Sequence, residues 1–436
     1  MSVLRIRDVR LLVGAVGLSA AGDTVLWVLL ALHIGATGGS ALAVSALFVC
    51  LWGPVVVLGG VAGRIVDRYE NRRLLIVASL AQAAVVAAMA GTTGSLPLLL
   101  GLCVLLGCGV AVSSPAEFAL VPAAAGEERV AEANGHVEAA RYLGMTAGPL
   151  LGGVLAAAGL TRAGLLLNAA SFLAVAGAGL ALHARRRPAR ATAPHEHGSV
   201  ALLFGDRRLA IVMTAAIGSL LFFTMSVAAE VFFATEVLDA GPAAYGLLMT
   251  AWMLGMVGGA VGLARLVPPA WLAAGALAGI ALQGAGLLGA AVGATLATAL
   301  AGCFVGGIAH GAKNVLLRTL IHDRVPEARR GSAFATYNAL RNGAELAALS
   351  AGGALVGIAG AQLALALSGA IPIAIALVAL VALRRAAQAP RSTRRRNRRK
   401  RSAGPRATAR RISVPSGVRV GRKSNRGMCV KVDDAT

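Results

Sequence analysis

The sequence is poor in charge, in aromatic side chains and in cysteine. Only 14% of its 436 residues are charged and 4% are aromatic, whereas 57% are hydrophobic. An ordinary soluble domain is about a quarter charged, so this composition excludes a soluble enzyme, a collagen-like chain and a wholly disordered chain. The few aromatic residues predict few stacking surfaces in any binding cavity, which disfavours an aromatic cage for cations.

Motifs for cofactors and metals are also lacking. The five cysteines show no metal or redox spacing, and small buried apolar residues are their usual role. His195 and His197 are too few ligands for a metal site. The sequence contains no phosphate-binding Gly-Lys-Ser/Thr loop, so ATP-driven transport by this chain is not expected. We therefore expect no cofactor, no metal and no enzymatic activity.

Long apolar runs dominate what is present. A membrane-spanning helix needs about 20 mostly apolar residues, and the sequence offers twelve such runs. They lie near residues 11–33, 41–62, 74–91, 95–115, 139–160, 164–183, 209–233, 243–263, 268–290, 293–317, 333–358 and 362–383. The predicted fold is therefore an all-α membrane protein with twelve transmembrane helices.

The basic residues predict the orientation in the membrane. They concentrate before the first run and in alternate loops, at residues 5–10, 64–73, 185–208 and 324–330. By the positive-inside rule, both termini are then cytoplasmic, in a multi-pass protein of the plasma membrane. Residues 384–436 hold 18 Lys and Arg against two Asp, so they carry +16 of the net charge of +22. Such a tail favours anionic lipid of the inner leaflet; without interleaved aromatic residues, specific nucleic-acid binding is not expected.

Two parts of the chain match at an offset of 204 residues. Val121-Pro122 corresponds to Val325-Pro326, and Asn134 to Asn338, in the connections after the fourth and tenth runs. Two pseudo-symmetric six-helix bundles with a central cytoplasmic loop are the layout of one class of secondary transporter. The domains expected are an N-terminal bundle, a cytoplasmic linker, a C-terminal bundle and a basic disordered tail, at residues 1–183, 184–205, 206–385 and 386–436.

The loop after the second run carries the first family motif. It has a glycine, three further residues, Asp-Arg and then a basic pair, which are Gly63, Asp67, Arg68, Arg72 and Arg73. This pattern resembles the signature of the major facilitator superfamily. The resemblance implies a cytoplasmic gate. In this gate the glycine permits close helix packing and the charged residues hold the cytoplasmic side closed. Glu70 and Asn71 replace the commoner Gly and Arg, as in the drug and siderophore exporter branch.

The fifth run carries a second motif. It is similar to the superfamily's antiporter signature at every fixed position, which are Gly144, Gly148, Pro149, Gly152 and Gly153. Small residues four apart let membrane helices pack backbone to backbone; the partner expected is the eighth run, with Gly255 and Gly259. In the family this element accompanies export. The arginine that many proton-driven exporters carry on the fourth span is missing, since the matching positions are Cys103 and Leu105.

Asp23 is the first candidate for proton coupling. It is about halfway along the first run, and ionisable groups at membrane depth are costly and usually functional. A carboxylate in a low-dielectric medium can take up and release a proton near neutral pH. The pair Gly22-Asp23 resembles the macrolide-efflux- and enterobactin-exporter-like branch. The alternative role is a hydrogen bond between helices.

Further ionisable residues are weaker candidates for coupling. Arg341 and Glu345 are spaced for an i, i+4 pair. His310 and Lys313 share a helix face, and Lys313 either pairs with Glu345 across two helices or extends to the inner surface. Glu230 is expected near the outer mouth, as a proton acceptor or as a rim carboxylate without a special role.

These patterns together predict a monomeric secondary exporter of amphipathic small molecules, drugs or metabolites, driven by proton antiport and alternating access. Its partners would be a small organic substrate, protons and the bilayer. Two alternatives stay open within transport, which are an uptake symporter and an exporter dedicated to one metabolite such as a siderophore. A non-transporting membrane receptor is the alternative from another class.

Overall fold

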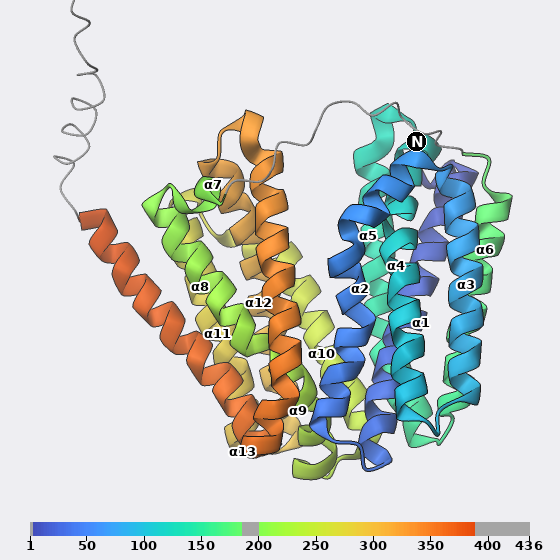
Figure 1. Ribbon diagram of the computed structural model, residues 1–436. Helices are drawn as coiled ribbons and strands as arrows, with labels where there is room; N and C mark the ends of the chain where they lie inside the picture. Colours follow the sequence, from blue (N-terminus) through green and yellow to red (C-terminus); the bar gives the residue numbers. More distant parts are fainter. Residues whose placement is uncertain (1–2, 185–199, 389–436) are drawn as a thin grey trace, which may run out of the picture. The chain divides into compact units, whose positions relative to one another are not determined.

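The computed structural model describes residues 3–184 and 200–388, and every element in these ranges is helical (Figure 1). Contacts divide the chain into two compact units, Met1–Ala387 and Gln388–Thr436, and the candidate membrane helices lie in the first. The predicted basic tail and most of the predicted linker, with His195 and His197, lie outside the described residues. Helices are favoured in lipid because each satisfies its backbone polar groups internally.

Six long helices form the N-terminal half. They are α1 (Arg7–Ala36), α2 (Ala41–Arg68), α3 (Asn71–Gly91), α4 (Leu96–Ala125), α5 (Val130–Ala157) and α6 (Thr161–Ala181). Within this half α1 packs mainly on α5 and α6, and α4 packs on α2 and α3. Several helices continue beyond the apolar runs, and α4 ends at Ala125 rather than near residue 115, so charged residues that sequence analysis placed in loops are helical.

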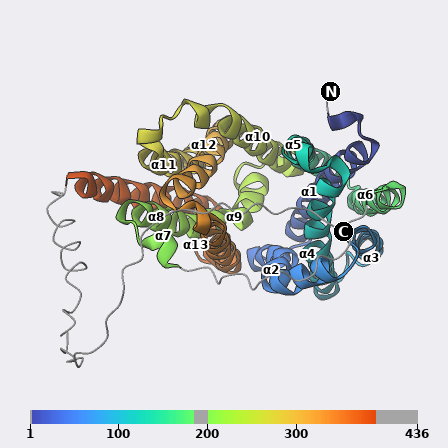
Figure 2. The same ribbon diagram turned by 90° about the horizontal axis from the view of Figure 1, so that it is seen from above.

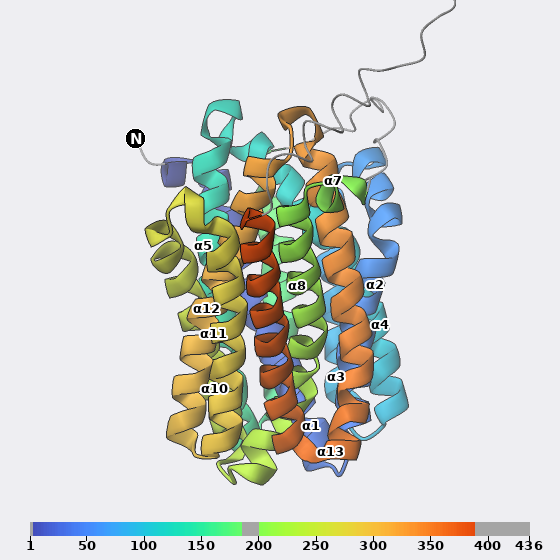
Figure 3. The same cartoon turned by 90° about the vertical axis from the view of Figure 1, so that its left-hand side faces the viewer.

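The C-terminal half contains the remaining helices. They are α7 (Ala201–Phe204), α8 (Arg207–Thr224), α9 (Ser226–Phe232), α10 (Gly241–Val261), α11 (Leu272–Gly293), α12 (Leu296–Arg324) and α13 (Arg330–Gln388). Side-chain caps fix some helix starts, such as the Asp206 carboxylate, which accepts from the backbone N–H groups of Arg208 and Leu209. Figure 3 shows α8, α10, α11, α12 and α13 as neighbouring, roughly upright helices.

Ten of the described helical stretches are long and apolar enough to cross a membrane. One of them, α13, contains a break at Gly360, where φ is 77°, so it comprises two successive segments. The more polar helix α5 is as long as the others and packs between α1 and α10. With α13 divided and α5 included, the described helices account for the twelve predicted spans.

The seventh span is discontinuous. Helix α8 ends at Thr224, Met225 intervenes, and α9 is followed by a π-helical turn over Phe233–Val237. Irregular turns inside a membrane helix are tolerated where they line a cavity or are covered by protein. This interruption lies beside the space between the two halves, where α9 approaches α1 and α2 (Figure 2).

Candidate functional site

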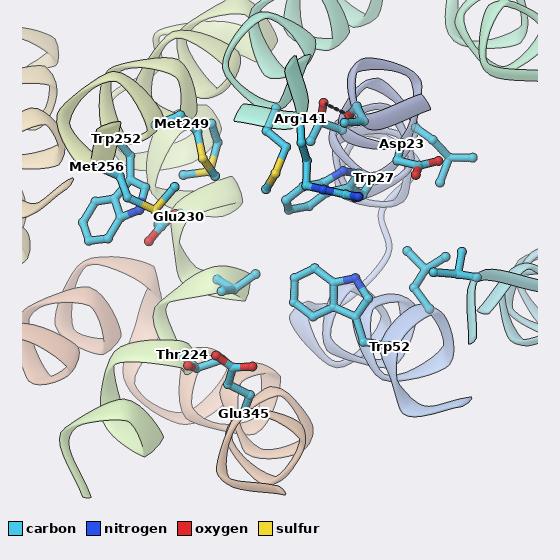
Figure 4. Close-up of a pocket in the computed structure, with 18 of the residues that line it drawn as sticks. Asp23, Trp27, Trp52, Arg141, Thr224, Glu230, Met249, Trp252, Met256 and Glu345 are labelled. Atoms are coloured by element: carbon cyan, nitrogen blue, oxygen red, sulfur yellow. Dashed lines mark hydrogen bonds between the residues drawn. The ribbon is translucent and has the colours of Figure 1, made fainter. Parts of the chain in front are cut away.

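A cavity of about 500 Å³ lies between the two halves. Its wall combines α1, α2, α4 and α5 from the first half with α8, α9, α10, α12 and α13 from the second. Figure 4 shows side chains from both halves directed into this space. A concave site formed by two bundles is where small molecules bind in proteins of this architecture.

Asp23 borders this cavity from the middle of α1. The helix is held close to α6 at the preceding residue, because a Cβ atom at Gly22 would collide with the side chain of Asn168 and lie 2.6 Å from the Ser171 hydroxyl. Asp23 is within electrostatic range of Glu117 and Arg141. In Figure 4 it is drawn on the far side of Trp27 from the second half.

An ion pair that sequence analysis missed joins α4 to α5 beside Asp23. Arg141 donates from Nη2 to Oε1 of Glu117 at 2.7 Å, and its Nε lies 3.7 Å from Glu138. The guanidinium is 4.9 Å from the ring centroid of Phe118, within cation–π distance. Arg141 also lines the cavity. The signal available in the sequence was one charge just after the fourth apolar run, Glu117, and one near the start of the fifth, Arg141.

Glu230 lies in the cavity wall, on the short helix α9 of the interrupted span. Its Oε1 accepts a 2.7 Å hydrogen bond from the hydroxyl of Ser226, one turn earlier. Glu230 thus borders the central cavity, and its expected position near the outer mouth stays a prediction. Figure 4 places Glu230 beside Trp252 and Met256.

The expected pair within α13 is present, whereas the expected pair between helices is not. Arg341 donates to Oε1 of Glu345 at 2.8 Å and both line the cavity. Lys313, only 4% exposed, donates instead to Oε1 of Gln283 on α11 at 2.8 Å. The same oxygen lies 3.3 Å from His310 Nδ1. Lys313 thus neither pairs with Glu345 nor extends to the surface, because Gln283 satisfies it within the C-terminal half.

Aromatic residues gather at the cavity despite their scarcity. Three of the four tryptophans line it, namely Trp27, Trp52 and Trp252. The Trp27 and Trp52 ring centroids are 5.6 Å apart on the first half. On the second half Phe223 stacks on Trp252 at 5.2 Å with an interplanar angle of 19°. The prediction of few stacking surfaces is wrong, because composition does not reveal that residues from separate helices converge.

The loop motif after α2 stays within the first half. Arg72 donates to the backbone carbonyls of Gly179 and Leu180 at the end of α6, at 2.8 and 2.7 Å. Arg73 pairs with Glu70 at 3.0 Å, and Asp67 and Arg68 are exposed. The role expected of Gly63 is not seen, since a Cβ atom there would have no neighbour within 4 Å. The structure thus does not use this glycine for close packing.

The glycines of α5 divide between two partners. A Cβ atom at Gly144, Gly148 or Gly152 would collide with or press on α1 of the same half. Only Gly153 faces the expected eighth span, where a Cβ atom would lie 3.0 Å from the Cα atom of Gly246 on α10. The expected partners on α10 are wrong: Gly255 and Gly259 pack on Phe304 and Ile308 of α12.

Comparisons with known proteins agree on one architecture. A family model described as the Major Facilitator Superfamily matches residues 12–275 and 235–421. The solved nucleoside transporter NupG superposes with a TM-score of 0.69 at 13% identity, covering 86% of this chain and 99% of that one. A bacterial homologue of the iron transporter ferroportin, in an inward-facing state, gives 0.67 at 16% identity, covering 88% and 99%. The POT family transporter PepTSo gives 0.68 at 10%, covering 88% and 99%. No curated protein sequence matches.

Proposed function

Because the chain belongs to the Major Facilitator Superfamily, we propose that it is a secondary active transporter that exports amphipathic small molecules by proton antiport. The motif after α2 and the pair Gly22-Asp23 support membership of the drug and siderophore exporter branch. The fold relatives carry nucleosides, peptides or iron by their names; at 10–16% identity they supply no substrate for this chain.

The observation that carries proton coupling is the position of Asp23. Its carboxylate borders the cavity from the middle of a membrane helix, and no ion pair among the described residues includes it. A carboxylate in such a place is costly unless it can be protonated or can meet a cation. We infer that Asp23 carries the proton, and that the nearby pair of Glu117 and Arg141 senses its charge.

Alternating access is supported by contacts concentrated at one end of the cavity. Where α2 begins, the Gly353 N–H donates to the Ser45 hydroxyl at 2.7 Å, and at the separate interface of α5 with α10 Gly153 meets Gly246. If the loops rich in arginine are cytoplasmic, these contacts close the outer end. We propose an inward-facing state, from which residues 1–183 rock against residues 206–385.

In the opposite state the inner end must close. Asp67 and Arg68 end α2 at that side and are exposed here, so they are available to latch onto the second half. Arg72 and Arg73 instead hold the loop to its own half. The glycines of the antiporter-like motif support export in two ways. Gly144, Gly148 and Gly152 allow α5 to pack closely on α1, and Gly153 presents no side chain to α10.

Dye accumulation in cells that lack other pumps tests this function. Cells expressing the intact chain should accumulate less ethidium, a cation, or less Nile red, a neutral dye, than cells with an empty vector, and a protonophore should remove the difference. The variant Asp23→Asn should remove it too. Asp239→Asn is the matched control, since this exposed loop residue has a φ of 47°, which asparagine tolerates.

The outcomes separate the alternatives. Protonophore-sensitive export that persists in Asp23→Asn would overturn the assignment of the proton site. Higher accumulation than with the empty vector would indicate an uptake symporter. No change with either dye, followed by no change with native metabolites, would favour a non-transporting receptor and contradict the proposal.

A further inference from the structure

We propose that the cavity binds a flat aromatic monocation, held between tryptophans of the two halves with its charge beside Glu230. This substrate class rests on the proposed transport function and makes it more specific. Three features carry it: aromatic surfaces on opposite walls, a carboxylate next to one of them, and the pairing of the cavity's basic groups.

The aromatic surfaces belong to different halves. Trp27 and Trp52 meet edge to face, with an interplanar angle of 69°, and Phe48 packs against both, which leaves Trp52 37% exposed. On the second half Trp252 is 8% exposed, with Phe223 stacked on it and the His310 ring 5.6 Å away. Figure 4 shows Trp27 and Trp52 on one side of the open space and Trp252 on the other. A flat ring system placed between them would contact both halves at once, and aromatic faces attract cations.

Flexible apolar side chains complete the wall. Met145, Met249, Met253 and Met256 line the same cavity. Methionine is unbranched and polarisable, so it adapts to ligands of different outline and contacts aromatic rings favourably. Such a lining suits a rigid aromatic ligand better than a polar one that needs many fixed hydrogen-bond partners.

Glu230 supplies the negative charge that would face the cationic ligand. Its carboxylate stands beside Trp252 in the cavity and accepts a hydrogen bond from Ser226. No ion pair among the described residues includes it. A carboxylate removed from bulk water gains most from a cation placed against it, and a ring-borne cation between Glu230 and Trp252 would satisfy both partners.

The basic groups of the cavity are already engaged. Arg141 pairs with Glu117 at 2.7 Å and Arg341 with Glu345 at 2.8 Å. Lys313, behind the wall, is bonded to Gln283. Among the carboxylates of the lining, Glu345 is thus paired, whereas Asp23 and Glu230 belong to no ion pair among the described residues. This balance favours a cationic ligand over an anionic one.

Asp23 and Glu230 would then have different tasks. Asp23 lies on the far side of Trp27, beside α6 (Figure 4), whereas Glu230 faces the space between the tryptophans. The first is placed to exchange a proton and the second to contact the ligand.

Equilibrium dialysis on the purified full chain in detergent at pH 7 tests the proposal. The probes are N-methylphenanthridinium, its neutral analogue 6-methylphenanthridine and the anion phenanthrene-9-carboxylate, which share a flat ring system. The intact chain should bind the cation at least tenfold more tightly than the neutral analogue, and the anion most weakly. Glu230→Gln should reduce the cation preference to within threefold without weakening the neutral analogue, which also shows that the cavity is intact.

Matched controls come from the same chain. Glu236→Gln changes an exposed carboxylate six residues away, and it should keep the preference. Trp252→Leu should weaken both the cation and the neutral analogue at least fivefold, whereas Trp271→Leu, at a tryptophan that is 63% exposed, should change neither.

Several results would overturn the substrate class. These are equal binding of cation and neutral analogue by the intact chain, tightest binding of the anion, a preference that survives Glu230→Gln, or no binding of any probe. If Nile red is still exported in a protonophore-sensitive way, the transport proposal stands and only the substrate class fails. Specific cation binding without export of either dye would instead retain the site and remove the transport function.

Discussion

Gly153 of α5 and Gly246 of α10 face each other so closely that a Cβ atom on either would lie 3.0 Å from the other's Cα atom. The two helices belong to different halves of the molecule. Small residues permit such an approach, and a methyl group at either position must push the backbones apart. One added carbon atom at this contact should therefore affect the movement of the two halves relative to each other.

We expect Gly246→Ala to reduce dye export at least tenfold, because the added methyl group also collides with the backbone carbonyl of Pro149. Gly258→Ala on the same helix is the control, since a Cβ atom there has no neighbour within 4 Å. Export and the thermal transition of the purified protein are measured for both. Unchanged export in Gly246→Ala would show that this contact opens freely.

Removing one member of the pair formed by Arg141 and Glu117 should destabilise the protein. Their side chains are 25% and 12% exposed, and an uncompensated buried charge costs about 3–5 kcal/mol when burial is complete. For this partly exposed pair we expect about 2 kcal/mol for Glu117→Gln.

The double variant Glu117→Gln with Arg141→Gln should recover most of that loss, because it removes both buried charges and leaves only Glu138, whose side chain is 41% exposed, without its arginine. The stabilities of the single and double variants are compared by thermal unfolding, with size-exclusion chromatography as the readout. A double variant less stable than both single variants would show that the two side chains act independently.

Lys313 should be chemically protected. It is the only lysine before residue 400, it is 4% exposed, and its Nζ is bonded to Gln283. In detergent, acetylation by sulfosuccinimidyl acetate should be at least tenfold slower than in the chain unfolded by dodecyl sulfate. Peptide mass spectrometry gives the rates. Rates within threefold of each other would mean that the lysine reaches solvent, as the alternative of an extended surface side chain requires.

The break in α13 should depend on Gly360. Its φ of 77° and ψ of 160° lie in a region that is essentially restricted to glycine, where another residue costs about 1–3 kcal/mol. We expect both Gly360→Ala and Gly360→Asn to lower stability by about that amount, because neither side chain is tolerated there.

Gly357→Ala is the control for this break. It lies three residues earlier, within the helical part of α13, and an added Cβ atom has no neighbour within 4 Å. Alanine should be neutral or slightly stabilising there because of its helix propensity. Equal effects at both positions in thermal unfolding would contradict the assignment of strain to the turn.

Local properties of the chain predicted the class and the spans. Absence of charge over about 20 residues determines whether a segment can enter lipid, and the helix then follows from its own backbone hydrogen bonds. The i, i+4 pair of Arg341 and Glu345 was also predictable from spacing alone, because residues four apart are neighbours on the surface of a helix. Asp23 could be singled out because one carboxylate in an apolar run is conspicuous wherever the helix packs.

Contacts between distant segments were decided only by the tertiary structure. Helices in lipid choose partners by shape and van der Waals contact rather than by burial of apolar surface, so glycine spacing on α5 did not reveal that Gly144 packs on α1. Only the packing of α9 shows that Glu230 borders the cavity. Likewise, three tryptophans separated by up to 225 residues line the same cavity. The sequence by itself determined which segments cross the membrane. The packing of whole helices decided which side chains meet and which charges are buried, because those contacts depend on the complementary surfaces of segments far apart in the chain.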